Sequence, residues 1–212
     1  MAIAQQIDFE DVKGLNLSYY TTPISSDIGD LDGDSIPEYV LVFNTIDTAD
    51  VASNRELVVL KQNGGLWYVW KTSKSAILSS NEGGIMGDPF EELFIDSNKI
   101  FISHFGGSNW RWHFVDSYTL IEDTFFLATH YSYWGSFCAE KVEIDFNLLS
   151  GRILYSIDLE ECGEGFGDNS HLLEHLPMSE SFFYEGLKIG LQNRLDTNFL
   201  IISPKNGFEI SL

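Results

Sequence analysis

Residues 30–38 bring together four acidic side chains that could bind a metal ion. Aspartates occupy three alternate positions, a glycine allows the chain to turn between them, and a glutamate follows four residues later. So many carboxylates in one turn repel one another unless a cation is bound, and Ca²⁺ takes six to eight oxygen ligands. The spacing therefore predicts a calcium loop, although a solvated acidic turn is the alternative. The expected ligands are the side chains of Asp30, Asp32, Asp34 and Glu38 and the carbonyl oxygen of Ile36.

The loop does not have the pattern of an EF-hand. An EF-hand loop has glycine at its sixth position and glutamate at its twelfth, and helices lie on both sides of it. Counted from Asp30, these positions are Ser35 and Leu41. Residues 38–43 are mostly β-branched and aromatic, which predicts a buried strand directly after the loop. A bound ion is therefore expected to stiffen the turn, with no part in catalysis.

The segment Ile28-Gly-Asp-Leu-Asp-Gly-Asp-Ser-Ile-Pro-Glu-Tyr-Val-Leu-Val42 resembles the calcium loop of FG-GAP repeats, the blade units of integrin-type β-propellers. The usual pattern has glycine at the position of Ser35 and aspartate at the position of Glu38. Glutamate can still ligate, so the resemblance implies a calcium site with altered geometry. The match spans about 15 residues and occurs once, whereas propellers carry several copies.

A second resemblance involves three further segments. They are similar to a group of bacterial secreted or lipoprotein-like proteins that combine one FG-GAP-like loop with a Gly-Gly-Ser-x-Trp-Arg-Trp segment. This resemblance implies no particular activity. The segments are residues 83–90, 104–112 and 145–151.

The composition favours one β-rich domain over residues 1–212, with residues 1–27 as a weakly structured lead-in. The chain contains 16 Phe, 9 Tyr, 5 Trp and 18 Gly, which suits strands and tight turns. Alternating and apolar segments predict an antiparallel meander of twisted sheets, propeller-like or sandwich-like. One short helix is expected near the C-terminus, at residues 179–191, with Ser179 as its N-cap.

The net charge of −20 limits the partners. It argues against nucleic acids and anionic membranes, whose negative charges would be repelled, and no apolar run is long enough to span a bilayer. A basic protein or a cation fits this charge. A soluble acidic protein without such a partner is the alternative.

The cellular compartment depends on indirect signs. Cys138 and Cys162 could form a disulfide in an oxidising compartment, or both could be free thiols. Ala2-Ile-Ala4 matches the small-residue end of a secretory signal, but no basic or apolar region precedes it. We expect a secreted, periplasmic or cell-surface protein, because calcium is millimolar outside cells, and the alternative is a cytoplasmic one.

Residues 104–114 form the second candidate site. On a strand, Trp110, Trp112 and Phe114 point to one side, and Arg111 and His113 point to the other. The aromatic row could bind a sugar ring or a cationic side chain of a partner. Alternatively, the row belongs to the core.

Patterns for other chemistry are incomplete. Ser108 lacks the second glycine of a Gly-x-Ser-x-Gly elbow, and the histidines lack the spacing of a zinc site. We therefore expect a non-enzymatic calcium-binding β module that binds another macromolecule. The second hypothesis is an acidic immunity protein that neutralises a basic toxin, and the third is a hydrolase that acts on glycans.

Overall fold

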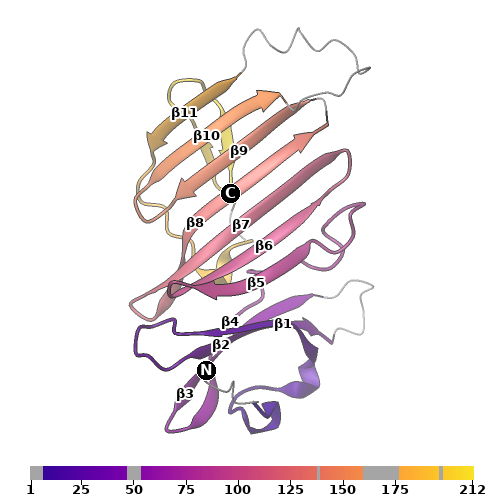
Figure 1. Ribbon diagram of the computed structural model, residues 1–212, viewed down its shortest axis with the longest axis vertical. Helices are drawn as coiled ribbons and strands as arrows, with labels where there is room; N and C mark the ends of the chain where they lie inside the picture. The colour runs from indigo at the N-terminus through magenta and orange to yellow at the C-terminus, as the bar shows by residue number, and fades with distance from the viewer. Residues whose placement is uncertain (1–6, 47–53, 138, 160–176, 196–197) are drawn as a thin grey trace.

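The computed structural model describes residues 7–46, 54–137, 139–159, 177–195 and 198–212, and these residues are mainly β (Figure 1). Two antiparallel sheets and a short hairpin make up the fold. The sheets share one apolar core, so the architecture is sandwich-like, as the composition and patterning predicted. No helix in these ranges is long and apolar enough to cross a membrane.

The first sheet has four strands in chain order, each paired with the next. Strands β2 and β3 lie at its centre, and nearly all their apolar side chains are buried because both faces of the sheet are covered. One face packs against the N-terminal segment around Val12, and the other joins the main core. The strands are β1 (Tyr20–Gly29), β2 (Glu38–Thr45), β3 (Arg55–Asn63) and β4 (Leu66–Ser73).

The second sheet has seven strands, again in chain order, so that each hairpin pairs neighbouring strands. Its core face carries Ile100, Tyr118, Phe146 and Tyr155, all fully buried. The strands are β5 (Phe90–Asp96), β6 (Lys99–Gly107), β7 (Trp110–Ile121), β8 (Thr124–Ser136), β9 (Glu140–Asn147), β10 (Arg152–Leu159) and β11 (Met178–Phe183).

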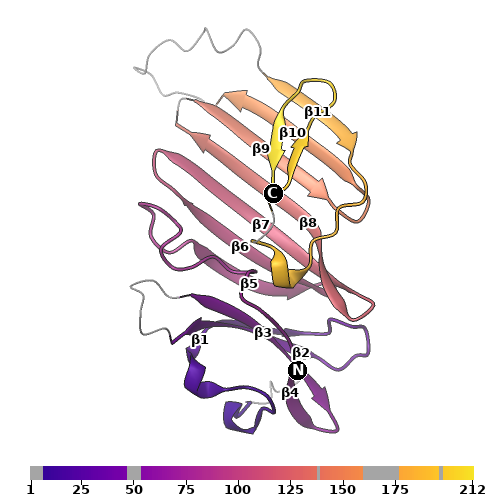
Figure 2. The same ribbon diagram turned by 180° about the vertical axis from the view of Figure 1, so that it is seen from behind.

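The C-terminal segment covers one face of the seven-stranded sheet (Figure 2). It contains a 3-10 turn, η4 (Leu191–Asn193), and a hairpin of β12 (Leu200–Ile202) and β13 (Glu209–Ser211). Ile189, Leu191, Ile201 and Ile210 insert from this segment into the main core. The opposite face of the sheet is not covered by the hairpin (Figure 1).

The helix predicted at residues 179–191 is wrong. Met178–Phe183 form strand β11, which pairs with β10 so that Ser179 lies opposite Ser156. Glu180 is buried there, and its carboxylate accepts hydrogen bonds from the Tyr155 hydroxyl and from the backbone N–H of Lys205. Helix propensity is a weak preference, and these sheet and side-chain hydrogen bonds outweigh it.

The predicted lead-in is also more ordered than expected. Two short 3-10 helices, η1 (Phe9–Asp11) and η2 (Leu17–Tyr19), precede strand β1. Strand β1 follows and runs from Tyr20 to Gly29 along the edge of the first sheet, beside β2. Cys138, Cys162 and the acidic stretch 160–170 lie outside the described residues.

Candidate functional site

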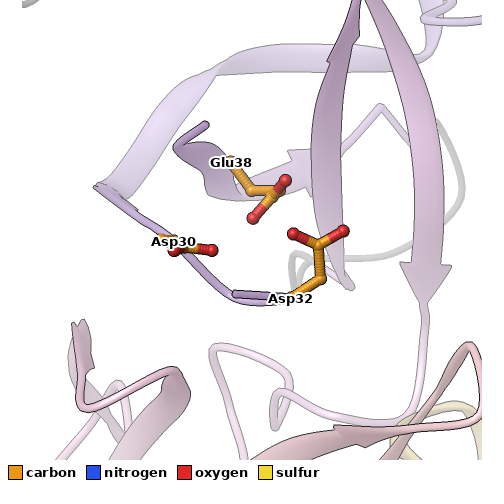
Figure 3. Close-up of side chains that lie close together, drawn as sticks. All are labelled: Asp30, Asp32 and Glu38. Carbon is orange, nitrogen blue, oxygen red and sulfur yellow. The ribbon is translucent and has the colours of Figure 1, made fainter. Parts of the chain in front are cut away.

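The predicted calcium loop connects β1 to β2. Gly29 and Glu38 are paired in the antiparallel ladder, so the loop begins and ends at neighbouring positions. The carboxylates of Asp30, Asp32 and Glu38 are turned toward one another (Figure 3), and each offers an oxygen within 4.8 Å of the others. In the described part of the chain, this is the group of acidic, His or Cys side chains close enough to share a metal ion.

The loop is held by its own aspartates. The two carboxylate oxygens of Asp30 accept hydrogen bonds from the N–H groups of Gly33, at 2.7 Å, and Ser35, at 3.0 Å. Asp32 accepts one from the N–H of Asp34 at 3.3 Å, and Asp34 accepts one from the N–H of Ile36 at 2.7 Å. These bonds curl the backbone around the carboxylates, with φ values of 81° at Gly33 and 68° at Ser35.

Glu38 is the buried member of the cluster, with 0% of its surface exposed. One oxygen, Oε2, accepts a hydrogen bond of 2.8 Å from the N–H of Leu31. The other, Oε1, has no hydrogen-bond partner among the described residues. Burial raises the pKa of Glu38 above its usual value, and the negative charges of Asp32 and Asp34 act in the same direction. Such a carboxylate gains from a nearby positive charge.

Lys61 on β3 supplies a positive charge that sequence reasoning missed. Its Nζ donates to Asp32 Oδ2 and lies 3.4 Å from Asp34 Oδ2 and 3.6 Å from Glu38 Oε1. Burial lowers the pKa of Lys61, but the hydrogen bond and charge of Asp32 outweigh this effect and hold the pKa above its usual value. Only the β2–β3 register, with Tyr39 opposite Leu60, places Lys61 beside Glu38, and the sequence carries no direct sign of that register.

The loop also contacts the second sheet. The side-chain amide of Asn98, in the β5–β6 turn, donates a 2.6 Å hydrogen bond to the carbonyl oxygen of Asp30. Asp27 accepts a 2.6 Å hydrogen bond from the N–H of Ile95 on β5. The acidic cluster therefore lies where the four-stranded and seven-stranded sheets meet.

Only three of the five predicted ligands point toward a common centre. Asp30, Asp32 and Glu38 form the cluster, whereas Asp34 lies at its side and faces Lys61. Ile36 has an exposed side chain, and its N–H bonds to Asp34. The arrangement can hold a hard cation through carboxylate oxygens, which are the ligands that Ca²⁺ prefers.

Comparison of the chain with protein-family models, with curated proteins and with solved structures finds no match. The resemblance to FG-GAP loops therefore rests on the motif alone.

The tryptophan segment forms the start of β7, and its side chains alternate as predicted. Trp112 stacks on Phe114 with ring centroids 5.7 Å apart, on the face that bears the C-terminal segment. Trp110 is 48% exposed and packs against Trp134 on β8 at 5.5 Å. His113 bonds to Ser103 at 2.9 Å on the opposite face.

Arg111 is exposed and lies opposite Gly107 and Gly135 in the ladders. The row of Trp110, Trp112 and Phe114 thus runs from the exposed end of the strand toward the interior. The row is therefore packed at one end and accessible at the other, and its role in binding stays a prediction.

Beyond Phe114, three buried polar residues form a network. Asp116 on β7 receives a 2.6 Å hydrogen bond from Nε of Arg194, and its other oxygen lies 2.6 Å from Nδ1 of His130 on β8. Burial raises the pKa of Asp116, but Arg194 and His130 outweigh burial and lower it to about 2. The Arg194–Asp116 pair is buried, so each charge depends on the other. Nothing in the sequence links these positions.

Proposed function

We propose that the protein is a calcium-stabilised β module that binds another macromolecule. The observation that carries the calcium site is the buried Oε1 of Glu38, which accepts no hydrogen bond from the described residues and belongs to a carboxylate cluster. Asp30, Asp32 and Glu38 would hold the ion. Asp34 adds a fourth negative charge beside them.

Charge balance supports a divalent ion in addition to Lys61. Asp32, Asp34 and Glu38 form ion pairs with Lys61, and Asp30 adds a fourth carboxylate to the cluster, so the cluster keeps an excess of negative charge even with Lys61 in place. A divalent cation removes most of this excess, whereas the single ammonium group of Lys61 neutralises only one charge, although it lies beside three of the carboxylates. Calcium is millimolar outside cells, so the proposal places the protein in a secreted, periplasmic or cell-surface setting.

The test is a calcium titration by calorimetry on protein treated with EDTA. We expect saturable binding at micromolar to millimolar calcium and a higher melting temperature when calcium is bound. The variant Asp32→Asn/Asp34→Asn keeps the shape of the loop and should lose the binding. The control Glu91→Gln/Asp158→Asn removes the same charge from exposed positions on two other strands and should bind as the wild type does. Equal binding by both double variants, or no effect of calcium on the wild type, would contradict the calcium site.

The uncovered face of the seven-stranded sheet supports the macromolecular part of the proposal. Tyr131 and Tyr133 project from β8 on this face, beside the carboxylates of Asp145 and Glu143 on β9. Burial raises the pKa of Tyr131, and the negative charges of Glu143 and Asp145 act in the same direction. Tyrosines that are half-exposed among acids suit contact with a basic protein.

The same face and the charge of −20 favour a second candidate, an acidic inhibitor of a basic protein. An inhibitor of this kind gains association rate from electrostatic steering, which salt suppresses. Capture of basic proteins from the source organism, compared at low and high salt and with calcium or EDTA, separates the two functions. The inhibitor is indicated if a basic protein binds at low salt and not at high salt, if EDTA does not change this binding, and if binding blocks the activity of the basic protein. Capture that needs calcium indicates the calcium-stabilised module.

A further inference from the structure

A pocket of about 520 Å³ lies between the seven-stranded sheet and the segments that cover it. Its lining residues place it on the face of the sheet that bears the C-terminal hairpin, and Figure 2 shows the hairpin on that face. The floor comes from β7, β8 and β9, and the walls come from Leu78, Glu82 and the C-terminal residues around Glu209. The volume is in the range of pockets that bind small molecules. None of its lining residues belongs to the acidic loop, so the pocket is independent of the proposed calcium site.

The floor of the pocket is aromatic. Trp112, Phe114 and Trp134 contribute rings from neighbouring strands, and Trp134 keeps 36% of its surface exposed. Gly106 on β6 makes room for the Trp112 indole, since a Cβ at that position would lie 2.4 Å from the ring. The indole of Trp112 can therefore lie over β6 because residue 106 has no side chain.

The charged groups that line the pocket favour positive ligands. Glu82 and Glu209 lie on its walls, and no ion pair joins either to a described residue. Arg194 is the lining residue with a permanent positive charge, and Asp116 neutralises it through the buried ion pair. Rings on the floor and carboxylates on the walls together form an environment that attracts a cation.

We propose that this pocket binds a small organic cation, a quaternary or protonated amine with a short hydrocarbon body. The ammonium group lies over the rings of Trp112 and Trp134, whose faces carry partial negative charge, and the hydrocarbon part packs beside it. The carboxylates of Glu82 and Glu209 neutralise the ammonium group from the walls. An anionic ligand would meet these carboxylates and find Arg194 already paired.

The direct test compares ligands of the same shape and different charge. Choline and its neutral counterpart 3,3-dimethyl-1-butanol form one such pair, and n-butylammonium and 1-butanol form another. Calorimetry and quenching of tryptophan fluorescence should show millimolar or tighter binding of at least one cation. The neutral partner should bind about tenfold more weakly, as expected when a cation–π contact and a carboxylate are lost. Equal binding of the charged and neutral partners would overturn the proposal, and so would binding of neither cation.

Variants locate the site. Glu209→Gln and Trp112→Leu should each weaken cation binding about fivefold or more, whereas Glu91→Gln, on the exposed side of β5, should leave it unchanged. Since Trp112→Leu could disturb the sheet, Glu82→Gln serves as a second polar variant on a different wall. Cellobiose tests the competing ligand class, and stronger binding of this sugar than of either cation would make the pocket a glycan site and overturn the proposal. The affinity of the pocket for the organic cation should be the same in calcium and in EDTA, because the pocket and the proposed calcium site share no residue.

Discussion

The ammonium group of Lys61 lies 3.6 Å from Oε1 of Glu38, a buried carboxylate oxygen that accepts no hydrogen bond from the described residues. The separation is that of an ion pair without a hydrogen bond. Lys61 instead donates its hydrogen bond to Asp32. Its charge still stabilises the Glu38 carboxylate, but Oε1 of Glu38 accepts no hydrogen bond from it. Lys61 thus stabilises the carboxylate cluster electrostatically and leaves Oε1 of Glu38 able to accept another ligand.

Replacement of Lys61 with methionine should separate the roles of lysine and calcium. Without calcium, the Lys61→Met variant should unfold more readily by about 1–3 kcal/mol, because the buried Glu38 loses its neighbouring positive charge. With calcium, much of this loss should be recovered, and the affinity for calcium should rise. Chemical denaturation with calcium and with EDTA measures both effects. A variant whose stability does not respond to calcium would show that the ammonium group is the only cation that this cluster binds.

The pH dependence of stability should depend on Glu38. Its raised pKa means that the folded state holds a proton more tightly than the unfolded state does, so the calcium-free protein should lose stability as the pH rises above the usual range of a glutamate. Glu38→Gln, which keeps the acceptor for Leu31, should remove this slope, and bound calcium should remove it too. Thermal melts between pH 4 and 8 give the comparison. A slope that persists in Glu38→Gln would assign it to another group.

Ser35 occupies a left-handed backbone conformation, with φ at 68°, at the position where FG-GAP loops have glycine. Side chains other than glycine are strained there. Ser35→Gly should therefore stabilise the protein by about 0.5–1 kcal/mol, even after allowing for the greater freedom of glycine in the unfolded chain. Ser35→Ala is the matched comparison, since it removes the hydroxyl and keeps the Cβ. Equal stability of the two variants would mean that the backbone is not strained at this residue.

The buried network around Asp116 should make a large contribution to stability. Asp116→Asn leaves the charge of Arg194 buried without a counter-ion, and we expect a loss of about 3–5 kcal/mol. Asp145→Asn, at an exposed position on strand β9 of the same sheet, should change stability by no more than about 0.5 kcal/mol. Urea denaturation of both variants at neutral pH is the measurement. A small effect of Asp116→Asn would indicate that water reaches Arg194.

Gly29, at the end of β1, packs closely against β5. A Cβ at this position would lie 2.6 Å from Cγ2 of Ile95, so Gly29→Ala should force the two strands apart and destabilise the protein by about 1–3 kcal/mol. The double variant Gly29→Ala/Ile95→Ala should recover part of this loss relative to the two single changes. Strictly additive effects in the double-mutant cycle would argue against a clash between these two residues.

The sequence predicts the strands well because their patterns are local. The alternation in Lys141-Val-Glu-Ile-Asp-Phe146 places Val142, Ile144 and Phe146 in the core, and β9 is found there. The acidic cluster was predictable for the same reason, since its members lie within nine residues. Lys61, Asn98 and Arg194 were not, because their positions at these sites follow from strand register and from the packing of distant segments. The helix expected at residues 179–191 failed similarly, since a free edge of β10 decides the structure of Met178–Phe183.

The hydrogen bonds from Asn98 to Asp30 and from Ile95 to Asp27 fasten the acidic loop to the second sheet. An ion held by Asp30, Asp32 and Glu38 would therefore stabilise the contact between the two sheets from the side of the loop. The β5–β6 turn stabilises the same contact from the side of the second sheet. Without the ion, Lys61 offsets only part of the repulsion among the four carboxylates of this loop. The bending stiffness of the whole molecule would then follow the calcium concentration around it, although the ion touches only one turn.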